Sequence, residues 1–161
     1  MTELALPKID KDTISRKDQI VSHLKKFTKD ENILSENEEI KPYETDGLAA
    51  YKQTPLAVVL PENTKEVSEI LKFCNEENIK VIPRGAGTGL SGGALPLQDA
   101  ILLGLGKFNK ILEIDFENKC VVTQPGVTNL GITHAVQHKG YYYAPDPSSQ
   151  LACSIGGNVA E

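Results

Sequence analysis

Pro83-Arg84-Gly85-Ala86-Gly87-Thr88-Gly89-Leu90-Ser91-Gly92-Gly93-Ala94-Leu95-Pro96 is the stretch that decides the fold of this 161-residue chain. It follows Lys80-Val81-Ile82, a short apolar run that predicts a buried β-strand. Glycines at this density leave backbone N–H groups uncovered and let the main chain approach a ligand closely. A nest of N–H groups beside one arginine favours a diphosphate. Residues 84–93, the glycine loop, are therefore predicted to hold a nucleotide cofactor.

The glycine loop ends a predicted β-α-β unit. Residues 56–60 form an apolar run that predicts a buried strand, and Asn63-Thr64-Lys65-Glu66 has the spacing of a capping box that begins a helix. The core face of that helix is predicted to carry Val67, Ile70, Leu71 and Cys74. A crossover of this length predicts that the strands at 56–60 and 80–82 form a parallel pair. The ligand crevice then lies at their carboxyl ends.

The segments on either side of this unit differ in character. Residues 14–29 predict an amphipathic helix whose apolar face carries Ile20, Val21, Leu24 and Phe27. Residues 30–54 are acidic and loop-like, so residues 1–54 are interpreted as an N-terminal helix and arm, and residues 55–161 as the domain proper. Of the 13 glycines only Gly47 precedes Gly85, which places the ligand-facing loops late in the chain.

Beyond the glycine loop the sequence predicts further strands, with antiparallel pairing from Ile111 onward. Apolar runs at 100–103, 111–115 and 119–123 predict strands, the last two joined as a hairpin. Thr128 is positioned to cap a helix that continues to about Lys139 and is closed by Gly140. An irregular aromatic and proline-rich loop over 141–149 then leads to a second small glycine site at 154–158.

Composition excludes several classes of function. The net charge of −5 and the pI near 5.3 argue against a nucleic-acid partner, and the apolar runs are too short for a membrane span. The N-terminus lacks the features of a signal peptide, and three scattered cysteines are typical of reduced thiols, so a cytoplasmic protein is expected. His134 and His138 have a spacing that can grip a metal, but no third ligand is near in sequence, which favours a solvated helix face.

The glycine loop fits two kinds of nucleotide site. Gly87 to Gly92 satisfies G-x-G-x-x-G after a strand, the pattern of a Rossmann dinucleotide site. That site requires a helix to begin within the motif, because the helix N-terminus meets the pyrophosphate. Here Gly93 and Pro96 fall where the helix should run, so the context argues against an NAD-type fold. A P-loop is excluded because the chain contains no Gly-Lys-Ser/Thr.

Three separated motifs support a different assignment. Arg84 to Gly93, Pro145-Asp146-Pro147-Ser148-Ser149 and Ser154 to Glu161 occur in the order found in the FAD-dependent oxidoreductases typified by vanillyl-alcohol oxidase and p-cresol methylhydroxylase. Within that superfamily the chain most resembles glycolate oxidase FAD subunits and D-lactate dehydrogenases, over roughly residues 40–161. The resemblance implies an α+β fold: a PCMH-type FAD-binding domain with a small parallel β-α-β subdomain and the start of an antiparallel one, incomplete at its C-terminus.

The resemblance also implies site residues, all for non-covalent FAD. Backbone amides of the glycine loop would wrap the pyrophosphate, and Thr88 stands where some members carry a histidine bonded to the flavin. Arg84 would steady the loop or neutralise charge, although a surface ion pair is an alternative for it. The implied FAD-binding residues are Arg84, Gly85, Ala86, Gly87, Thr88, Gly89, Leu90, Ser91, Gly92, Pro145, Asp146, Ser149, Gly156, Gly157, Asn158 and Ala160.

The function implied by the resemblance is that of a cofactor module. We expect the FAD-binding portion of a flavin-dependent 2-hydroxy-acid dehydrogenase or oxidase, catalytically incomplete alone and without a catalytic residue of its own. The small 2-hydroxy acid is expected only in full-length family members, and a homodimer or a complementing chain is expected to cover the hairpin. A non-catalytic remnant or interaction module, or the FAD domain of another flavoenzyme on the same scaffold, are the alternatives.

Overall fold

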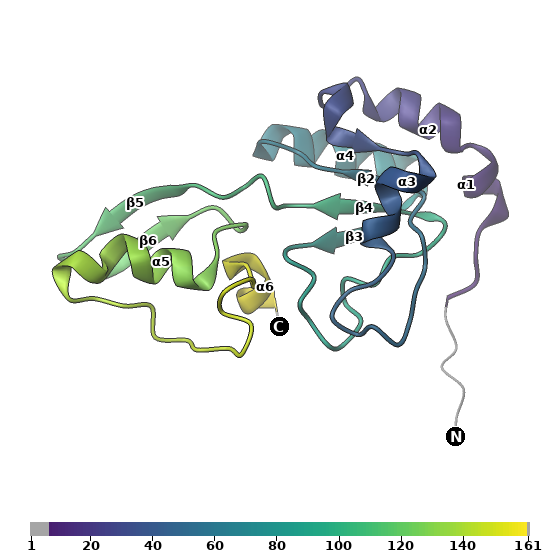
Figure 1. The fold of residues 1–161 in the computed structure, drawn as a ribbon. Coiled ribbons are helices and arrows are strands. Elements are labelled where there is room, and N and C mark those ends of the chain that lie inside the picture. Colours follow the sequence, from purple (N-terminus) through teal and green to yellow (C-terminus); the bar gives the residue numbers. More distant parts are fainter. Residues whose placement is uncertain (1–6, 161) are drawn as a thin grey trace.

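The computed structural model describes residues 7–160, which form two sheets placed end to end. Figure 1 shows the larger sheet with its helices at one end, the hairpin β5–β6 with α5 at the other, and α6 between them. The elements in chain order are α1 (Lys11–Ser15), α2 (Lys17–Leu24), η1 (Asp30–Asn32), β1 (Ile33–Leu34), α3 (Asn37–Ile40), η2 (Lys41–Tyr43), β2 (Ala57–Val59), α4 (Thr64–Glu76), β3 (Lys80–Arg84), β4 (Ala100–Gly104), β5 (Ile111–Asp115), β6 (Cys120–Thr123), α5 (Asn129–Val136), η3 (Gln137–Lys139) and α6 (Ile155–Ala160).

The larger sheet has the strand order β1-β2-β4-β3. β4 pairs in parallel with β2 on one side and with β3 on the other, so Leu102 lies opposite both Val58 and Ile82. The prediction that strands 56–60 and 80–82 pair directly is therefore wrong, although their parallel direction is confirmed. β4 takes the central place because every residue in it is apolar or glycine and buried, which suits a strand covered on both faces.

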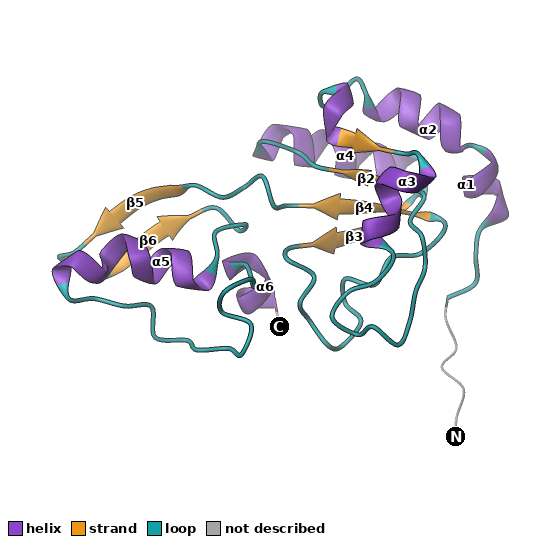
Figure 2. Cartoon of the chain, in the orientation of Figure 1, coloured by secondary structure: helices purple, strands orange, loops and turns teal. Residues whose placement is uncertain are grey.

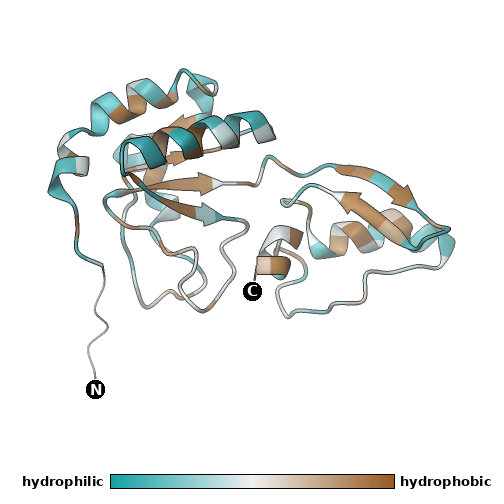
Figure 3. Ribbon diagram, turned by 180° about the vertical axis from the view of Figure 1, so that it is seen from behind, coloured by the Kyte–Doolittle hydropathy of each residue, from teal (hydrophilic) through white to brown (hydrophobic). Residues whose placement is uncertain are grey.

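Each face of this sheet has its own apolar cluster. Val59, Ile101 and Leu103 point toward α2 and α4, while Val58 and Leu102 point toward Ile40 at the end of α3. Figure 3 shows the apolar strands beneath a helix, α4, that is hydrophilic on its outer side. The helix begins as predicted, since the Asn63 side chain accepts a hydrogen bond from Glu66 N at 3.0 Å.

The core face of α4 differs from the predicted one in a single residue. Ile70 and Cys74 are buried as expected and Val67 packs against the cluster, but Leu71 is 44% exposed. Phe73 is buried in its place and contacts the rings of His23 and Phe27. The reason is that α2 crosses α4 on the Phe73 side, a tertiary contact that the helical period does not contain.

The N-terminal segment is more structured than expected. Instead of one helix over 14–29 there are two, α1 and α2, which meet at Arg16, whose φ of −92° and ψ of 9° are not helical. The predicted apolar face is nevertheless confirmed, because Ile20 and Leu24 are buried and Val21 and Phe27 pack on the core. The expectation that residues 30–54 are loop-like is wrong at β1, which pairs antiparallel with β2 as an edge of the sheet, and at the short helix α3.

The C-terminal part follows the predicted pattern closely. β5 and β6 pair antiparallel, and the turn between them is held by Asp115, whose carboxylate accepts hydrogen bonds from Glu117 N and Asn118 N, each at 3.0 Å. Thr128 caps α5 through Gly131 N, and Gly140 ends the following 3₁₀ turn with a φ of +78°. The sequence therefore predicted both ends of this helical segment.

Candidate functional site

A cavity of about 560 Å³ lies at the carboxyl end of β3, between the glycine loop and the chain around α6. Figure 2 shows long loops at this end of the larger sheet, and the glycine loop among them contains no helix. The cavity is lined by Pro83, Arg84, Gly85, Ala86, Gly87, Thr88, Gly89, Gly93, Ala94, Leu105, Pro125, Pro147, Ser149, Cys153, Ser154, Gly156, Gly157, Asn158 and Ala160. Two glycine-rich segments more than fifty residues apart thus form opposite walls of one site.

The shape of the glycine loop depends on two residues in left-handed backbone conformations. Gly87 has a φ of +70° and Gly92 a φ of +78°, a region that residues with a Cβ rarely occupy. No helix forms between Gly85 and Ala94, as the NAD-type alternative would require. The loop therefore presents main chain, and not a helix N-terminus, to the cavity.

The opposite wall is packed closely against the turn at Pro125. A Cβ on Gly156 would lie 2.7 Å from Pro125 Cβ, and Gly156 N donates to Pro125 O at 2.8 Å. Ser154 forms an isolated antiparallel bridge with Thr128, so the first turn of α5 and the start of α6 are held together. These contacts explain why a glycine is needed here: the backbone of α6 approaches a neighbouring turn.

Two polar atoms in this wall are buried and have no hydrogen-bond partner among the described residues. They are Ser154 Oγ and Asn158 Nδ2, and both residues line the cavity. A buried polar atom without a partner costs about 1–3 kcal/mol, so it points to a ligand or solvent molecule that completes it. The residues present thus fit a polar cofactor: a glycine-rich main chain lines one wall, and a hydroxyl and an amide without partners belong to the other.

Arg84 is held at the base of the glycine loop. Its Nη1 donates to Tyr43 O at 3.3 Å, and its guanidinium carbon lies 5.7 Å from the centre of the Tyr43 ring. Burial lowers the pKa of Arg84 below its ordinary value, and the nearby negative charge of Asp46 opposes that effect. Among the described residues Arg84 makes no ion pair within 4 Å, so the structure does not show the surface salt bridge that was its alternative reading.

Most of the predicted FAD-binding residues meet in this cavity. Arg84 to Gly89, Ser149, Gly156, Gly157, Asn158 and Ala160 line it. Leu90, Ser91, Gly92, Pro145 and Asp146 do not, and Leu90 is 72% exposed. Their contact with a cofactor stays a prediction, as do the individual roles of the residues that do line the cavity.

Some cavity residues were absent from the predicted set. Ser154 is the first residue of the second glycine site, and a hydroxyl two residues before Gly-Gly-Asn was a signal that could have found it. Pro125 and Leu105 also line the cavity, although both are far in sequence from the second glycine site and from the start of the glycine loop. Cys153 also lines the cavity and is only 4% exposed.

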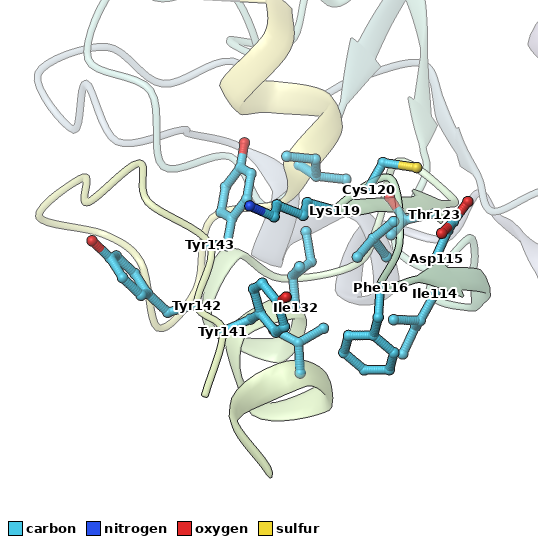
Figure 4. A pocket seen from close by; sticks show the side chains of 13 residues that line it. Ile114, Asp115, Phe116, Lys119, Cys120, Thr123, Ile132, Tyr141, Tyr142 and Tyr143 are labelled. Atoms are coloured by element: carbon cyan, nitrogen blue, oxygen red, sulfur yellow. The ribbon is translucent and has the colours of Figure 1, made fainter. Parts of the chain in front are cut away.

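A second, smaller cavity of about 270 Å³ lies between the hairpin β5–β6 and α5. Figure 4 shows Phe116, Lys119, Ile132 and Tyr141 among the side chains around it. None of the predicted FAD-binding residues lines it, whereas all three consecutive tyrosines, Tyr141–Tyr143, do. Tyr142 is the most exposed of the three, at 72%. The tyrosines thus belong to the hairpin side of the molecule and not to the glycine-loop cavity.

Two further features bear on the class of site. Within residues 7–160 no three His, Cys, Asp or Glu side chains are grouped so that they could hold a metal ion, and the His138 ring meets Phe116 edge-on. Over the same residues, no helix is both long enough and apolar enough to span a membrane.

Known proteins resemble this chain in both sequence and fold. Residues 55–161 match the family described as FAD binding domain. Glycolate oxidase subunit GlcD of Escherichia coli (strain K12) is 49% identical over 157 residues, which are 98% of this chain and 30% of that protein. D-lactate dehydrogenase of Anaerostipes hadrus is 41% identical over 116 residues, 71% of this chain and 24% of that protein.

The fold agrees with these similarities. A crystal structure of p-cresol methylhydroxylase with substrate bound superposes with a TM-score of 0.77 at 24% identity, covering 90% of this chain and 29% of that one. The α+β architecture with one parallel and one antiparallel sheet, predicted from the resemblance, is therefore confirmed. The chain spans about 30% or less of the length of these relatives.

Proposed function

This chain belongs to the FAD-binding domain family, and from that premise we propose that it is the cofactor-binding portion of a flavin-dependent dehydrogenase or oxidase for 2-hydroxy acids of the glycolate or D-lactate type. The observation that supports this proposal most directly is the cavity between the two glycine segments, whose lining includes both the glycine loop and two residues, Ser154 and Asn158, with a buried polar atom that lacks a partner among the described residues. The most similar relatives named above carry the substrate class in their own names.

Different residues of this chain are proposed to contact different parts of FAD. We propose that the main chain of Gly85 to Gly89 faces the diphosphate, because these five residues line the cavity and successive backbone amides can form an anion-binding nest. Ser154 and Asn158 offer the polar atoms of the facing wall. Leu105, Pro125 and Cys153 supply apolar surface that excludes water beside the flavin. When bound, FAD supplies the chemistry of accepting a hydride from the substrate carbon.

FAD is proposed to be held without a covalent bond. Thr88 contributes a hydroxyl to the cavity, and a hydroxyl is a weak nucleophile unless a base activates it. Among residues 7–160, the cavity lining contains no histidine, lysine or carboxylate that could act as that base. Acid precipitation of the FAD-loaded protein tests this point, because non-covalent FAD stays in the supernatant, whereas a yellow pellet would contradict it.

The same lining suggests that the described residues do not oxidise a 2-hydroxy acid unaided. Removing hydride from a 2-hydroxy acid also requires a group to take the hydroxyl proton. Arg84 is the only ionisable side chain besides Cys153 that lines the cavity in residues 7–160, and its guanidinium is packed against Tyr43. We therefore propose cofactor binding without turnover for this chain by itself.

A flavin titration tests the proposed function. The purified protein is mixed with excess FAD, desalted and examined for the visible absorbance of oxidised flavin, then given glycolate or D-lactate without oxygen. We expect retained flavin that neither acid bleaches. A protein that leaves the column colourless would overturn FAD binding, and rapid bleaching by either acid would overturn the proposal that the chain lacks turnover.

The hairpin side of the molecule supports a proposal about assembly. Leu112 on β5 and Val122 on β6 are 61% and 46% exposed, and both lie on a sheet of only two strands. A two-stranded sheet is marginal by itself, and exposed apolar strands favour pairing with another chain. We propose that this chain forms a homodimer through the hairpin, which light scattering tests: a monomer at high concentration would contradict it.

A further inference from the structure

The glycine loop is contacted from outside the cavity by an N-terminal segment, residues 43–48, here called the clasp. A Cβ on Gly47 would lie 2.6 Å from both Thr88 O and Gly89 O, and a Cβ on Gly92 would lie 3.6 Å from a methyl carbon of Leu48. Figure 1 shows the two segments running beside each other below the larger sheet. The clasp therefore touches the loop at its first and its second half.

Arg84 joins the clasp to the loop. Its guanidinium donates to Tyr43 O and lies over the Tyr43 ring, so the clasp fixes it by a hydrogen bond and by a face contact. The glycine loop turns around the opposite side of the Arg84 guanidinium. A Cβ on Gly87 would lie only 2.5 Å from Arg84 Nε and Nη2. The left-handed turn at Gly87 is thus built against a side chain that the clasp holds in place.

Asp46 supplies a negative charge that acts on the Arg84 guanidinium. The residue is 6% exposed, and its Oδ1 accepts a hydrogen bond from Leu48 N at 2.9 Å, while its Oδ2 is buried without a partner. A buried carboxylate is unfavourable unless a cation or donors compensate it. The charge of Asp46 acts on Arg84, which is itself half-buried, so each offsets part of the cost of burying the other.

We infer that Asp46, Gly47 and Arg84 are positioning residues that shape the glycine loop before FAD binds, with Arg84 acting on the loop through Tyr43 and not as a charge on the diphosphate. This inference rests on the proposed FAD site. It assigns a function to the arm before residue 55, which would otherwise serve only as an edge of the domain. It also resolves the two roles considered for Arg84 in favour of the structural one.

Paired substitutions at Arg84 separate positioning from charge. Arg84→Lys keeps a positive charge but loses the planar group that stacks on Tyr43 and fits inside the turn, whereas Arg84→Met loses both. If Arg84 positions the loop, both variants weaken FAD binding to a similar extent, by about tenfold or more. If its charge contacts the diphosphate, Arg84→Lys binds FAD nearly as well as the wild type while Arg84→Met does not, and the inference is wrong.

Gly47→Ala tests the clasp itself, with Gly106→Ala as its matched control. Neither glycine has a positive φ, so alanine is compatible with both backbones, but a Cβ meets two loop carbonyls at Gly47 and nothing within 4 Å at Gly106. We expect Gly47→Ala to weaken FAD binding about tenfold and Gly106→Ala to leave it unchanged. Equal affinity for Gly47→Ala and the wild type would overturn the role of the clasp.

A second measurement does not depend on FAD. Amide hydrogen exchange in the cofactor-free protein reports how firmly residues 85–92 are held. We expect faster exchange across the loop in Gly47→Ala and Arg84→Lys, with unchanged exchange in β4, and no change in Gly106→Ala. If the wild type fails to bind FAD but loop exchange is faster in these variants, the proposed function is wrong and the inference that the clasp shapes the loop is supported. Unchanged exchange in both variants would overturn the clasp in either case.

Discussion

Gly85 and Ser154 face each other so closely that a Cβ on Gly85 would overlap the Ser154 hydroxyl oxygen, while Ser154 Cβ would be an ordinary 3.5 Å away. The first residue of the glycine loop after Arg84 is therefore glycine because of its neighbour across the cavity and not because of its own φ, which is not positive. This contact joins the two glycine segments at one point.

Gly85→Ala is expected to destabilise the cofactor-free protein, and Ser154→Ala is expected to relieve most of that effect in the double variant. The reason is that Ser154→Ala removes the overlapping oxygen and leaves a normal contact. Thermal unfolding of the wild type, both single variants and the double variant gives the coupling free energy of the pair. A double variant no more stable than Gly85→Ala would show that the clash lies elsewhere.

Ser154→Ala alone is expected to affect FAD binding and stability differently. Ser154 Oγ has no partner among the described residues, so its removal costs no hydrogen bond in the cofactor-free protein. If FAD completes that hydroxyl, the variant binds FAD about tenfold more weakly, close to the net value of one hydrogen bond. Flavin fluorescence titration measures the affinity, with Ser68→Ala on α4 as the control. Unchanged affinity would exclude a contact between Ser154 and FAD.

Asp99 is expected to make stability depend on pH in the acid range. Its carboxylate is 2% exposed and accepts hydrogen bonds from Lys80 Nζ and Asp10 N, each at 2.6 Å. Burial alone would raise the pKa of Asp99, but these two bonds outweigh it and hold the pKa below its ordinary value of 3.8. The stabilisation is therefore complete above that value and is lost as pH falls through the lower, folded-state pKa.

Asp99→Asn tests this ion pair. We expect the variant to be less stable than the wild type at pH 7 by about 1–3 kcal/mol, because Lys80 loses its partner and a charge-assisted bond becomes a neutral one. The difference between the two proteins should shrink below pH 3.8. Urea unfolding at several pH values measures both effects, and a difference that does not change with pH would contradict the assignment.

The three cysteines are expected to differ widely in reactivity. Cys120 is exposed, whereas Cys74 and Cys153 are buried, and burial raises the pKa of the Cys74 thiol to about 11. Because the thiolate is the reactive form, a disulfide reagent at pH 8 should modify Cys120 rapidly and the other two only on unfolding. Cys120→Ser should abolish the fast phase. Rapid labelling of the folded Cys120→Ser variant would show that a buried cysteine opens to solvent.

Local patterns in the sequence predicted the parts of the fold that depend on neighbours along the chain. The Asn63 cap, the Asp115 turn and the segment from Thr128 to Gly140 are each fixed by side chains within a few residues. The apolar face with Ile20 and Leu24 follows for the same reason, since a helical period alone defines it. These elements agree with the structure because local preference and tertiary packing select the same conformation.

The parts that sequence reasoning missed depend on contacts between distant segments. Nothing in the period of α4 shows that Phe73, and not Leu71, faces the core, because that choice is made by α2. The place of β4 between β2 and β3, and the pairing of β1, are likewise set by long-range hydrogen bonds. In the candidate site, the contacts of Ser154 and of the clasp could not be predicted, because the residues that they touch lie far away in sequence. Gly47, alone among glycines before Gly85, was the one visible sign of the clasp.

The central place of β4 also fixes when this protein can begin to fold as it is synthesised. β2 and β3 share no hydrogen-bonded pairing and stand two strand spacings apart, roughly 10 Å, until β4 enters between them. A nascent chain that has not yet exposed Ala100–Gly104 therefore carries the glycine loop without the strand that joins β2 to β3. The glycine loop is thus synthesised before the strand that supports it, and domains generally fold as units while the chain emerges. FAD can therefore bind only after β4, the strand that follows the glycine loop, has left the ribosome.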